Sequence, residues 1–178
     1  MWMPLFYPNL HSPGREWYIL SEKLSKNELI AKRVSKELTG RLVVNLGIGI
    51  PTLIPKFLNN PEVFLHTENG MLGITEADEE HYDPNIVNAG KMPIAEIENS
   101  SYFNSAESFA MIRGGHVDVA VLGALQVDEK GRVANWSIPG KNIIGVGGAM
   151  DLLVGANKVI VAMTHLTKNN QIKIKKKC

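Results

Sequence analysis

Short apolar runs alternate with amphipathic stretches along most of the chain. Each run is nearly free of polar residues, and the four clearest cover residues 42–46, 63–66, 117–122 and 158–163. Strands that are apolar on both faces are typical of a parallel sheet covered by helices on each side. The pattern therefore predicts an α/β fold of three layers, with a mainly parallel sheet and helices on both faces.

Caps, apolar stripes and glycine stops predict helices between the apolar runs. Ser25 opens the first helix and forms a capping box with Glu28, and Asn104 opens a later one in the same way with Glu107. The predicted helices cover residues 25–40, 51–58, 104–114 and 149–154. A loop is expected for the acidic patch of Glu76, Asp78, Glu79 and Glu80.

The chain has the length and composition of one globular domain with a short N-terminal arm. It contains 178 residues, of which 44% are hydrophobic and 21% are charged. These are ordinary values for a soluble protein with one core. Residues 1–24 show no steady period and contain three prolines, so we expect an irregular arm there. Residues 25–178 are expected to form the domain.

Charge and cysteine content argue against several kinds of partner. Nineteen basic and eighteen acidic residues give a net charge of +1, which does not favour nucleic acid or an anionic membrane. Residues 168–178 hold five lysines and no acid, and for residues 173–177 we expect a solvated edge rather than a phosphate site. The single cysteine, Cys178, cannot form an internal disulfide, which fits a cytoplasmic protein. No stretch is long enough to span a bilayer, and the opening residues do not form a signal peptide.

Three glycine-containing turns, at residues 47–49, 68–70 and 145–148, hold most of the candidate chemistry. In an open parallel sheet such turns gather at the carboxyl ends of the strands, where ligands bind. Their N–H groups can face an anion or a developing oxyanion. Neither Gly-x-Gly turn is a full dinucleotide fingerprint, because Thr52 and Met150 occupy the last glycine position. Taken singly, each turn is explained as well by tight packing of a helix on a strand.

Glu68 is the strongest single candidate for a reactive group. It follows the apolar run 63–66 and precedes Asn69 and Gly70, a pair that readily adopts the φ > 0 conformations of a tight turn. A carboxylate held at the end of a buried strand suits a nucleophile or a general base. His66 lies on the same side of that strand, and we expect a structural role for it. No histidine pair has metal-ligand spacing, so no metal site is predicted.

Taken together, these motifs resemble those of one family, the B subunits of class I coenzyme A transferases of the 3-oxoacid type, which use succinyl-CoA or acetate and acetoacetate. The matching segments follow one another from about residue 26 to residue 178. They are residues 45–51, 68–73, 88–91, 108–116, 122–127, 134–141 and 147–152. So many ordered matches are far more specific than any one glycine motif, and they imply a CoA transferase-like α/β fold.

The resemblance implies a role for each turn. Glu68 would be the catalytic nucleophile: it attacks the acyl-CoA carbonyl and forms an acyl-glutamyl anhydride and then a glutamyl-CoA thioester. An acceptor acid reverses these steps. The residues implied to surround Glu68 are Gly147, Gly148 and Ala149, at the oxyanion and CoA, and Asn69, Gly70, Gly47 and Gly49, which shape the site. No metal or organic cofactor is implied, because coenzyme A is a substrate.

The resemblance also implies partners. Family members pair the B subunit with a separate A subunit, typically as α2β2, so this chain would be active only with that partner. Its substrates would be an acyl-CoA and a short carboxylic acid such as acetoacetate, with butyrate, succinate and acetate equally compatible. The family's chains usually continue beyond the equivalent of Lys177 and Cys178 with a further strand and helix. The loop at residues 74–78 departs from the family's Gly-Pro-containing loop, and residues 97–100 replace a usual Pro-Gly. Both segments are expected near the site, so the resemblance does not identify the acid.

Two other functions stay open from the sequence. Without the further strand and helix, the chain could be a truncated, inactive B subunit that only binds the A subunit. A sugar-phosphate or nucleotide sensor on a similar α/β scaffold would also fit the fold. Such a sensor would not need Glu68, so its binding should survive removal of that carboxylate.

Overall fold

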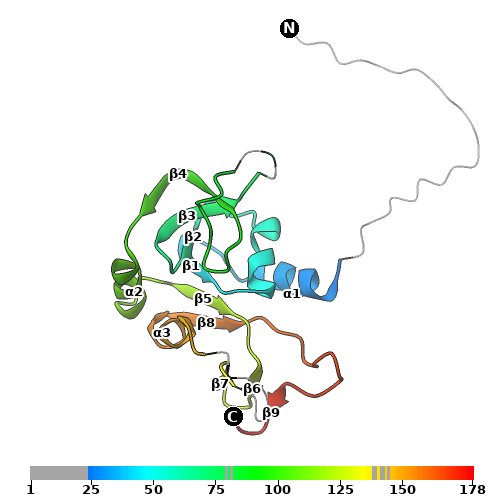
Figure 1. Cartoon of the computed structure of the whole chain (residues 1–178). Helices are drawn as coiled ribbons and strands as arrows, with labels where there is room; N and C mark the ends of the chain where they lie inside the picture. Colours follow the sequence, from blue (N-terminus) through cyan, green and yellow to red (C-terminus); the bar gives the residue numbers. More distant parts are fainter. Residues whose placement is uncertain (1–23, 79, 81, 138–139, 141–142, 144) are drawn as a thin grey trace, which may run out of the picture.

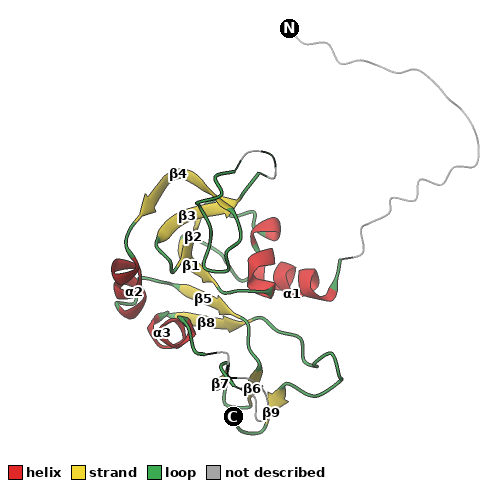
Figure 2. Cartoon of the chain, in the orientation of Figure 1, coloured by secondary structure: helices red, strands yellow, loops and turns green. Residues whose placement is uncertain are grey.

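The structure is a computed structural model that describes residues 24–78, 80, 82–137, 140, 143 and 145–178. Within these residues the chain forms a six-stranded sheet, a small three-stranded sheet, and helices that cover the larger sheet (Figures 1 and 2). The predicted arm at residues 1–24 lies outside the described residues except for Leu24, and so does Glu79 of the acidic patch.

The larger sheet has the strand order β4-β3-β2-β1-β5-β8. Its strands are β1 (Leu42–Leu46), β2 (Val63–Thr67), β3 (Met71–Glu76), β4 (Ile94–Tyr102), β5 (Val119–Leu122) and β8 (Lys158–Val161). Strand β1 pairs in parallel with β2 and β5, and β5 pairs in parallel with β8. The prediction of a mainly parallel sheet is confirmed, and β3 and β4 add an antiparallel edge to it.

The expectation of a loop at residues 74–78 is wrong for residues 74–76, and residues 97–100 also lie in a strand. Strand β3 extends through Glu76, and β4 includes all of residues 97–100. Strand β4 lies at the edge of the sheet, and most of its residues are exposed or half-buried. It therefore lacks the continuous apolar run that marks a strand buried on both faces.

Helices cover both faces of the larger sheet, as predicted. Helix α1 (Lys26–Ser35) packs on one face with two 3₁₀ helices, η1 (Ile50–Leu53) and η2 (Pro55–Phe57). Helices α2 (Ser105–Arg113) and α3 (Ala149–Gly155) contact each other on the opposite face (Figure 1). Strand β5 serves both layers: Val119 and Val121 join the core on the α1 side, and Ala120 and Leu122 join the core under α2 and α3.

Local sequence signals explain how the helices begin and end. Both predicted capping boxes are present, with Ser25 and Glu28 at α1 and the equivalent pair at α2. Helix α1 ends at Ser35, earlier than the predicted Gly40. The helix predicted over residues 51–58 is instead the pair of 3₁₀ helices. Pro55 explains this difference, because proline has no N–H to donate and its ring clashes with the carbonyl four residues back.

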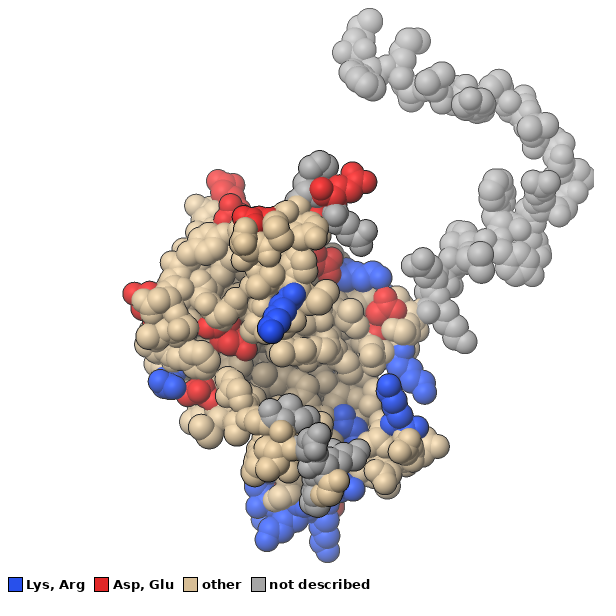
Figure 3. All heavy atoms as spheres, viewed as in Figure 1, with Lys and Arg blue, Asp and Glu red and all other residues tan. Residues whose placement is uncertain are grey.

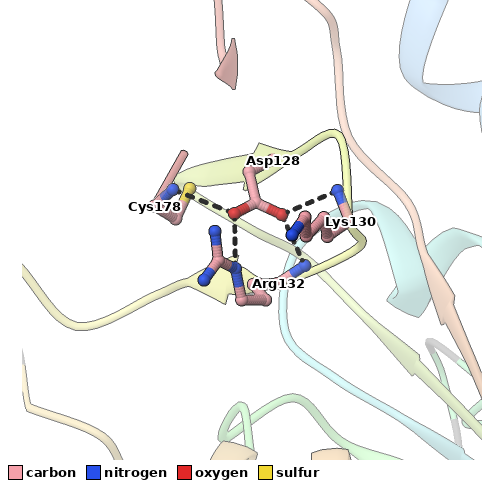
Figure 4. Close-up of polar contacts among 4 residues, drawn as sticks. All are labelled: Asp128, Lys130, Arg132 and Cys178. Atoms are coloured by element: carbon pink, nitrogen blue, oxygen red, sulfur yellow. Dashed lines mark hydrogen bonds and ion pairs between the residues drawn. The ribbon is translucent and has the colours of Figure 1, made fainter. Parts of the chain in front are cut away.

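The small sheet is fastened by one buried carboxylate, that of Asp128. It has the order β7-β6-β9, with β6 (Gln126–Asp128), β7 (Val133–Ala134) and β9 (Ile174–Lys175). Asp128 Oδ1 accepts hydrogen bonds from the N–H groups of Lys130 and Arg132, at 2.9 and 3.0 Å. Its Oδ2 accepts from Cys178 N at 3.0 Å and from Arg132 Nε at 2.6 Å (Figure 4). Asp128 thus ties the β6–β7 turn to the last residue of the sequence.

Basic side chains gather around this small sheet. Figure 3 shows lysine and arginine at the end of the molecule that carries it, whereas acidic side chains lie mainly over the opposite end. Lys176 and Lys177 are exposed there. Neither forms an ion pair with any residue that the structure describes. The exposure of Lys176 and Lys177 fits the solvated edge expected for residues 173–177.

Candidate active site

A cavity of about 530 Å³ lies where β1, β2 and β5 end, at the carboxyl edge of the parallel strands. Most of its lining comes from residues 47–48 after β1, Glu68 after β2, residues 122–125 at the end of β5, and residues 145–149 at the start of α3. The three turns that the sequence predicted to gather at this edge therefore meet around one cavity.

Glu68 is held half-buried in the tight turn between β2 and β3. The turn closes through a hydrogen bond from Gly70 N to Thr67 O at 3.0 Å. Gly70 has a φ of +126°, and a Cβ built on it would clash with the carbonyl oxygen of Phe103. A glycine is therefore required for both its conformation and its close approach to the backbone. The requirement explains why an Asn-Gly pair follows Glu68.

Asn69 braces the Glu68 turn from outside the cavity. Its Nδ2 donates to Val87 O at 2.8 Å, and its Oδ1 accepts from Thr67 Oγ1 at 2.7 Å. Thr67 Oγ1 also accepts from Ala89 N at 3.0 Å. These bonds fix the segment around residues 87–89 against the turn. Asn69 and Gly70 are thus placed to shape the turn, and neither lines the cavity with Glu68.

The hydrogen-bond partner of Glu68 is a residue that the sequence did not single out, Asn45. Its Nδ2 lies 3.1 Å from Glu68 Oε2 and also 3.1 Å from His66 Nδ1. Asn45 is the polar residue in the otherwise apolar β1, and its side chain is fully buried. That polar residue inside an apolar run was the available signal. Its partners lie 21 and 23 positions away, so only the pairing of β1 with β2 brings them together.

His66 is buried and neutral beside this pair. Only 1% of the residue is exposed, its ring stacks on Phe103, and its Nε2 lies 3.1 Å from Ser108 Oγ. Burial lowers the pKa of His66 from 6.5 to about 4, because a charged imidazolium would lose its water. The placement agrees with the structural role expected from the sequence.

Of the two glycines after β1 that were predicted to shape the site, Gly47 lines the cavity and Gly49 does not. Gly47 donates its N–H to Val121 O at 2.8 Å, and a Cβ there would lie 3.1 Å from Leu122 Cδ2. Its lack of a side chain lets the ends of β1 and β5 approach closely. Gly49 lies beyond the lining residues, with a φ of +91°, and it precedes η1. Gly49 therefore directs the chain away from the cavity and does not contribute to its wall.

The loop that leads into α3 lies directly against Glu68. A Cβ on Gly148 would lie 3.6 Å from Glu68 Cγ and 3.2 Å from Phe109 Cζ. The N–H groups of Gly147 and Gly148 donate no hydrogen bond to any residue that the structure describes. Ala149 is the first residue of α3 and also lines the cavity. The predicted oxyanion and CoA-binding residues and the predicted nucleophile are thus neighbours.

The arrangement leaves Glu68 able to react. Asn45 is the donor to its Oε2, and within the described part of the chain the carboxylate accepts no other hydrogen bond and forms no ion pair. A carboxylate whose charge is not neutralised by a cation keeps a lone pair available for attack. Backbone N–H groups that lack partners can receive an oxyanion formed beside it.

The described residues hold neither a metal cluster nor a membrane-spanning helix. Among them, no group of three or more His, Cys, Asp or Glu side chains is suited to hold a metal ion. None of the helices there has both the length and the apolar character needed to cross a bilayer.

Known proteins match this chain over most of its length. The model of the family described as "Coenzyme A transferase" matches residues 27–178. The beta subunit of the acetate CoA-transferase of Haemophilus influenzae is 50% identical over 156 residues, which are 87% of this chain and 70% of that protein. The B subunit of the succinyl-CoA:3-ketoacid coenzyme A transferase of Helicobacter pylori is 50% identical over 152 residues, which are 85% of this chain and 73% of that protein.

A solved structure shares the fold. The acyl-CoA transferase from Escherichia coli O157:H7, in a thioester complex with CoA, superposes with a TM-score of 0.59 and 24% sequence identity. The match covers 79% of this chain but only 24% of the E. coli chain, so this chain spans about a quarter of that protein. The likeness supports the three-layer α/β fold.

Proposed function

The chain belongs to the coenzyme A transferase family, and we propose that it acts as the B subunit of an enzyme that moves CoA between an acyl-CoA and a short-chain acid. The acid would be a 3-oxoacid such as acetoacetate, or a simple acid such as acetate. The observation that carries the proposal is the position of Glu68, with one oxygen free of hydrogen bonds within the described part of the chain, on the wall of a cavity that Gly147 and Gly148 also line.

Glu68 would carry first the acyl group and then CoA. Its carboxylate attacks the acyl carbonyl carbon, the carbon–sulfur bond breaks, and CoA leaves as a thiolate. The thiolate then attacks the glutamyl carbonyl of the resulting anhydride. The free acid departs with one oxygen of the Glu68 carboxylate, and a glutamyl-CoA thioester remains. A second acid attacks this thioester and displaces the thiolate, which gives a new acyl-glutamyl anhydride. The thiolate then attacks the acyl carbonyl of this anhydride, so that a new acyl-CoA forms and the Glu68 carboxylate is restored.

Each attack produces a tetrahedral carbon with a negatively charged oxygen. The N–H groups of Gly147 and Gly148 are the donors we propose for this charge, because Gly148 lies against Glu68 Cγ. One such donor typically lowers a barrier by about 2.7–4 kcal/mol. The scheme uses no metal and no organic cofactor, since the carboxylate itself is the covalent carrier.

The proposed partner is an A subunit, in an assembly such as α2β2. The two relatives above are, by name, a beta subunit and a B subunit. Exposed apolar residues line the cavity, including Ile48 at 67% and Val146 at 42% exposure. Apolar rims of this kind are typical of protein interfaces. The cytoplasm is the proposed compartment, because a single cysteine suits a reducing environment.

Covalent capture of the intermediate tests the proposal. The chain is mixed with acetoacetyl-CoA and an A subunit of the family, and the peptide that contains Glu68 is analysed by mass spectrometry. We expect a mass increase equal to the CoA thioester, which disappears when an acceptor acid is added. Glu68→Ala should show neither the adduct nor transfer. CoA transfer that persists in Glu68→Ala would overturn the assignment of the nucleophile.

A further inference from the structure

A row of buried polar side chains links the helix layer to the carboxylate of Glu68. Ser108 in α2 is fully buried, His66 in β2 is 1% exposed, and Asn45 in β1 is fully buried. The contacts along the row are Ser108 Oγ to His66 Nε2, His66 Nδ1 to Asn45 Nδ2, and Asn45 Nδ2 to Glu68 Oε2, each at 3.1 Å. A buried polar group needs a hydrogen-bond partner, and these side chains serve as partners for one another.

The donor and acceptor roles along the row follow from chemistry. Asn45 Nδ2 can only donate, so His66 Nδ1 must accept and the ring proton must sit on Nε2. His66 Nε2–H then donates to Ser108 Oγ. The two N–H bonds of the Asn45 amide therefore point one at His66 and one at Glu68. Once the nitrogen of the Asn45 amide is placed, the donor or acceptor role of each of these contacts follows.

The unfavourable part of this arrangement is the oxygen atom of the Asn45 amide. Its Oδ1 is buried and has no hydrogen-bond partner within the described part of the chain. Turning the amide over would leave the oxygen against the Glu68 carboxylate, where two electron-rich atoms would repel. The amide is thus oriented by its two acceptors and not by its own oxygen.

The row has the outline of a Ser-His-Asn triad, but it cannot act as one. In such a triad the histidine Nε2 must be free to take the proton of the serine. Here Nε2 carries the ring proton and donates it to Ser108, and both residues are closed off from solvent. These hydrogen bonds instead hold Asn45 in place, because His66 accepts from Asn45 and donates to Ser108.

We propose that His66 and Ser108 are positioning residues for Glu68, acting through Asn45. Ser108 fixes the tautomer and ring plane of His66, His66 fixes the amide of Asn45, and Asn45 keeps an N–H directed at Glu68 Oε2. The row holds the carboxylate at one angle to the cavity while the groups bound to it change. This role rests on the proposed nucleophilic function of Glu68.

A matched pair of His66 variants tests the role. The side-chain oxygen of an asparagine at position 66 takes the place of Nδ1 and can accept from Asn45. A glutamine there reaches the place of Nε2 and contacts Ser108, but it leaves the Asn45 N–H that faced Nδ1 without an acceptor. In the complex with an A subunit, we expect His66→Gln to lower kcat about tenfold, the loss typical of one hydrogen bond. His66→Asn should stay within about threefold of the unchanged protein, and KM should stay nearly constant in both.

Thermal unfolding of each variant separates positioning from folding. A purely structural role predicts that kcat follows the loss of stability, with the two variants affected alike or His66→Asn affected more. Either result would overturn the inference. If neither His66 variant folds, Ser108→Ala decides, because it removes one hydroxyl and leaves the fold: about a threefold lower kcat supports the row, and an unchanged kcat contradicts it.

Two controls accompany these variants. Ser35→Ala removes another buried serine hydroxyl, one that donates to Lys32 O in α1, and should leave kcat unchanged. Glu68→Ala in the same assay tests the proposed function separately. Full activity of Glu68→Ala would show that the nucleophile is wrong, whereas an inactive Glu68→Ala with equal His66 variants would show that only the positioning role is wrong.

Discussion

Two carboxylates, Glu68 and Asp128, each stand where a strand meets a tight turn, yet they have opposite surroundings. Asp128 accepts four hydrogen bonds and pairs with Arg132, so both of its oxygens are occupied. The N–H of Cys178, followed by the bonds from Arg132 and Lys130, holds the pKa of Asp128 well below its usual range. Glu68 accepts one hydrogen bond, from Asn45, within the described part of the chain.

The difference separates a carboxylate that fastens the chain from one that can attack. Hydrogen bonds to a carboxylate stabilise its charge and occupy the lone pairs that a nucleophile needs. Asp128 holds three segments of the small sheet together and gains from every donor. Glu68 is fixed by its turn and by one donor, which leaves lone pairs for the attack that we propose. The same exchange of carboxylate for amide at the two positions should therefore have opposite effects.

The largest effect is expected for Glu68→Gln. The amide keeps the volume of the side chain but is a far poorer nucleophile, so CoA transfer by the complex with an A subunit should fall by roughly 10⁴-fold or more. The melting temperature of the chain should hardly change, because the Glu68 carboxylate is held by the one hydrogen bond from Asn45. Steady-state kinetics and thermal unfolding of the same preparation check the loss of activity and the unchanged melting temperature. A variant that loses stability as much as activity would contradict the separation.

The free energy of unfolding should fall at acid pH because His66, next to Glu68, is buried. The pKa of His66 is about 4 in the folded chain, against 6.5 for an unperturbed histidine. Between these values the unfolded chain takes up a proton that the folded chain does not, so stability falls as pH drops from about 6.5 to 4. The full loss is roughly 3 kcal/mol, at about 1.4 kcal/mol per pH unit.

Denaturant unfolding at pH 7 and pH 5 measures the part of this loss that falls above pH 5, about 2 kcal/mol, with His66→Asn as the control. The variant has no imidazole and should lose much less stability over that range. The pKa values of Asp128 and Glu28 are lowered from 3.8 and 4.5, so their stabilising charges are lost only at more acid pH. An equal loss in the variant and the unchanged chain would assign the effect to another group.

The smallest effect is expected for Asp128→Asn. The amide has one acceptor oxygen in place of two and lacks the charge that pairs with Arg132. The small sheet should therefore become less stable. We expect the melting temperature to fall by roughly 5 °C. Transfer activity per folded complex should stay within about twofold, because Asp128 does not line the cavity around Glu68. A loss of activity without a loss of stability would show that the two carboxylates are not independent.

Sequence reasoning identified the site residues that act through local structure. The Asn-Gly pair marked the turn that carries Glu68, and glycines marked the other turns at the same edge. It missed the Asn45–His66 contact, because that contact joins positions 21 apart and depends on the register of β1 against β2. It also missed β4, whose polar, exposed residues carry no apolar run.

Secondary-structure type was harder to predict where two signals competed. Over residues 51–58 the apolar spacing and Pro51 favoured a helix, while Pro55 limits any helix that crosses it. The chain resolves the conflict as two short 3₁₀ helices. Capping boxes were predicted correctly at both α1 and α2, because each is a closed arrangement of residues three positions apart.

Gly70 has a consequence for anyone who reads a mutational screen of this chain. No other residue fits there, because any Cβ would clash with Phe103 O. A screen scored by enzyme activity would thus rank Gly70 beside Glu68, although one shapes the chain and the other is proposed to perform the chemistry. A second score for the amount of folded protein would separate them: substitutions at position 70 would vanish from both scores, and substitutions at position 68 from only one.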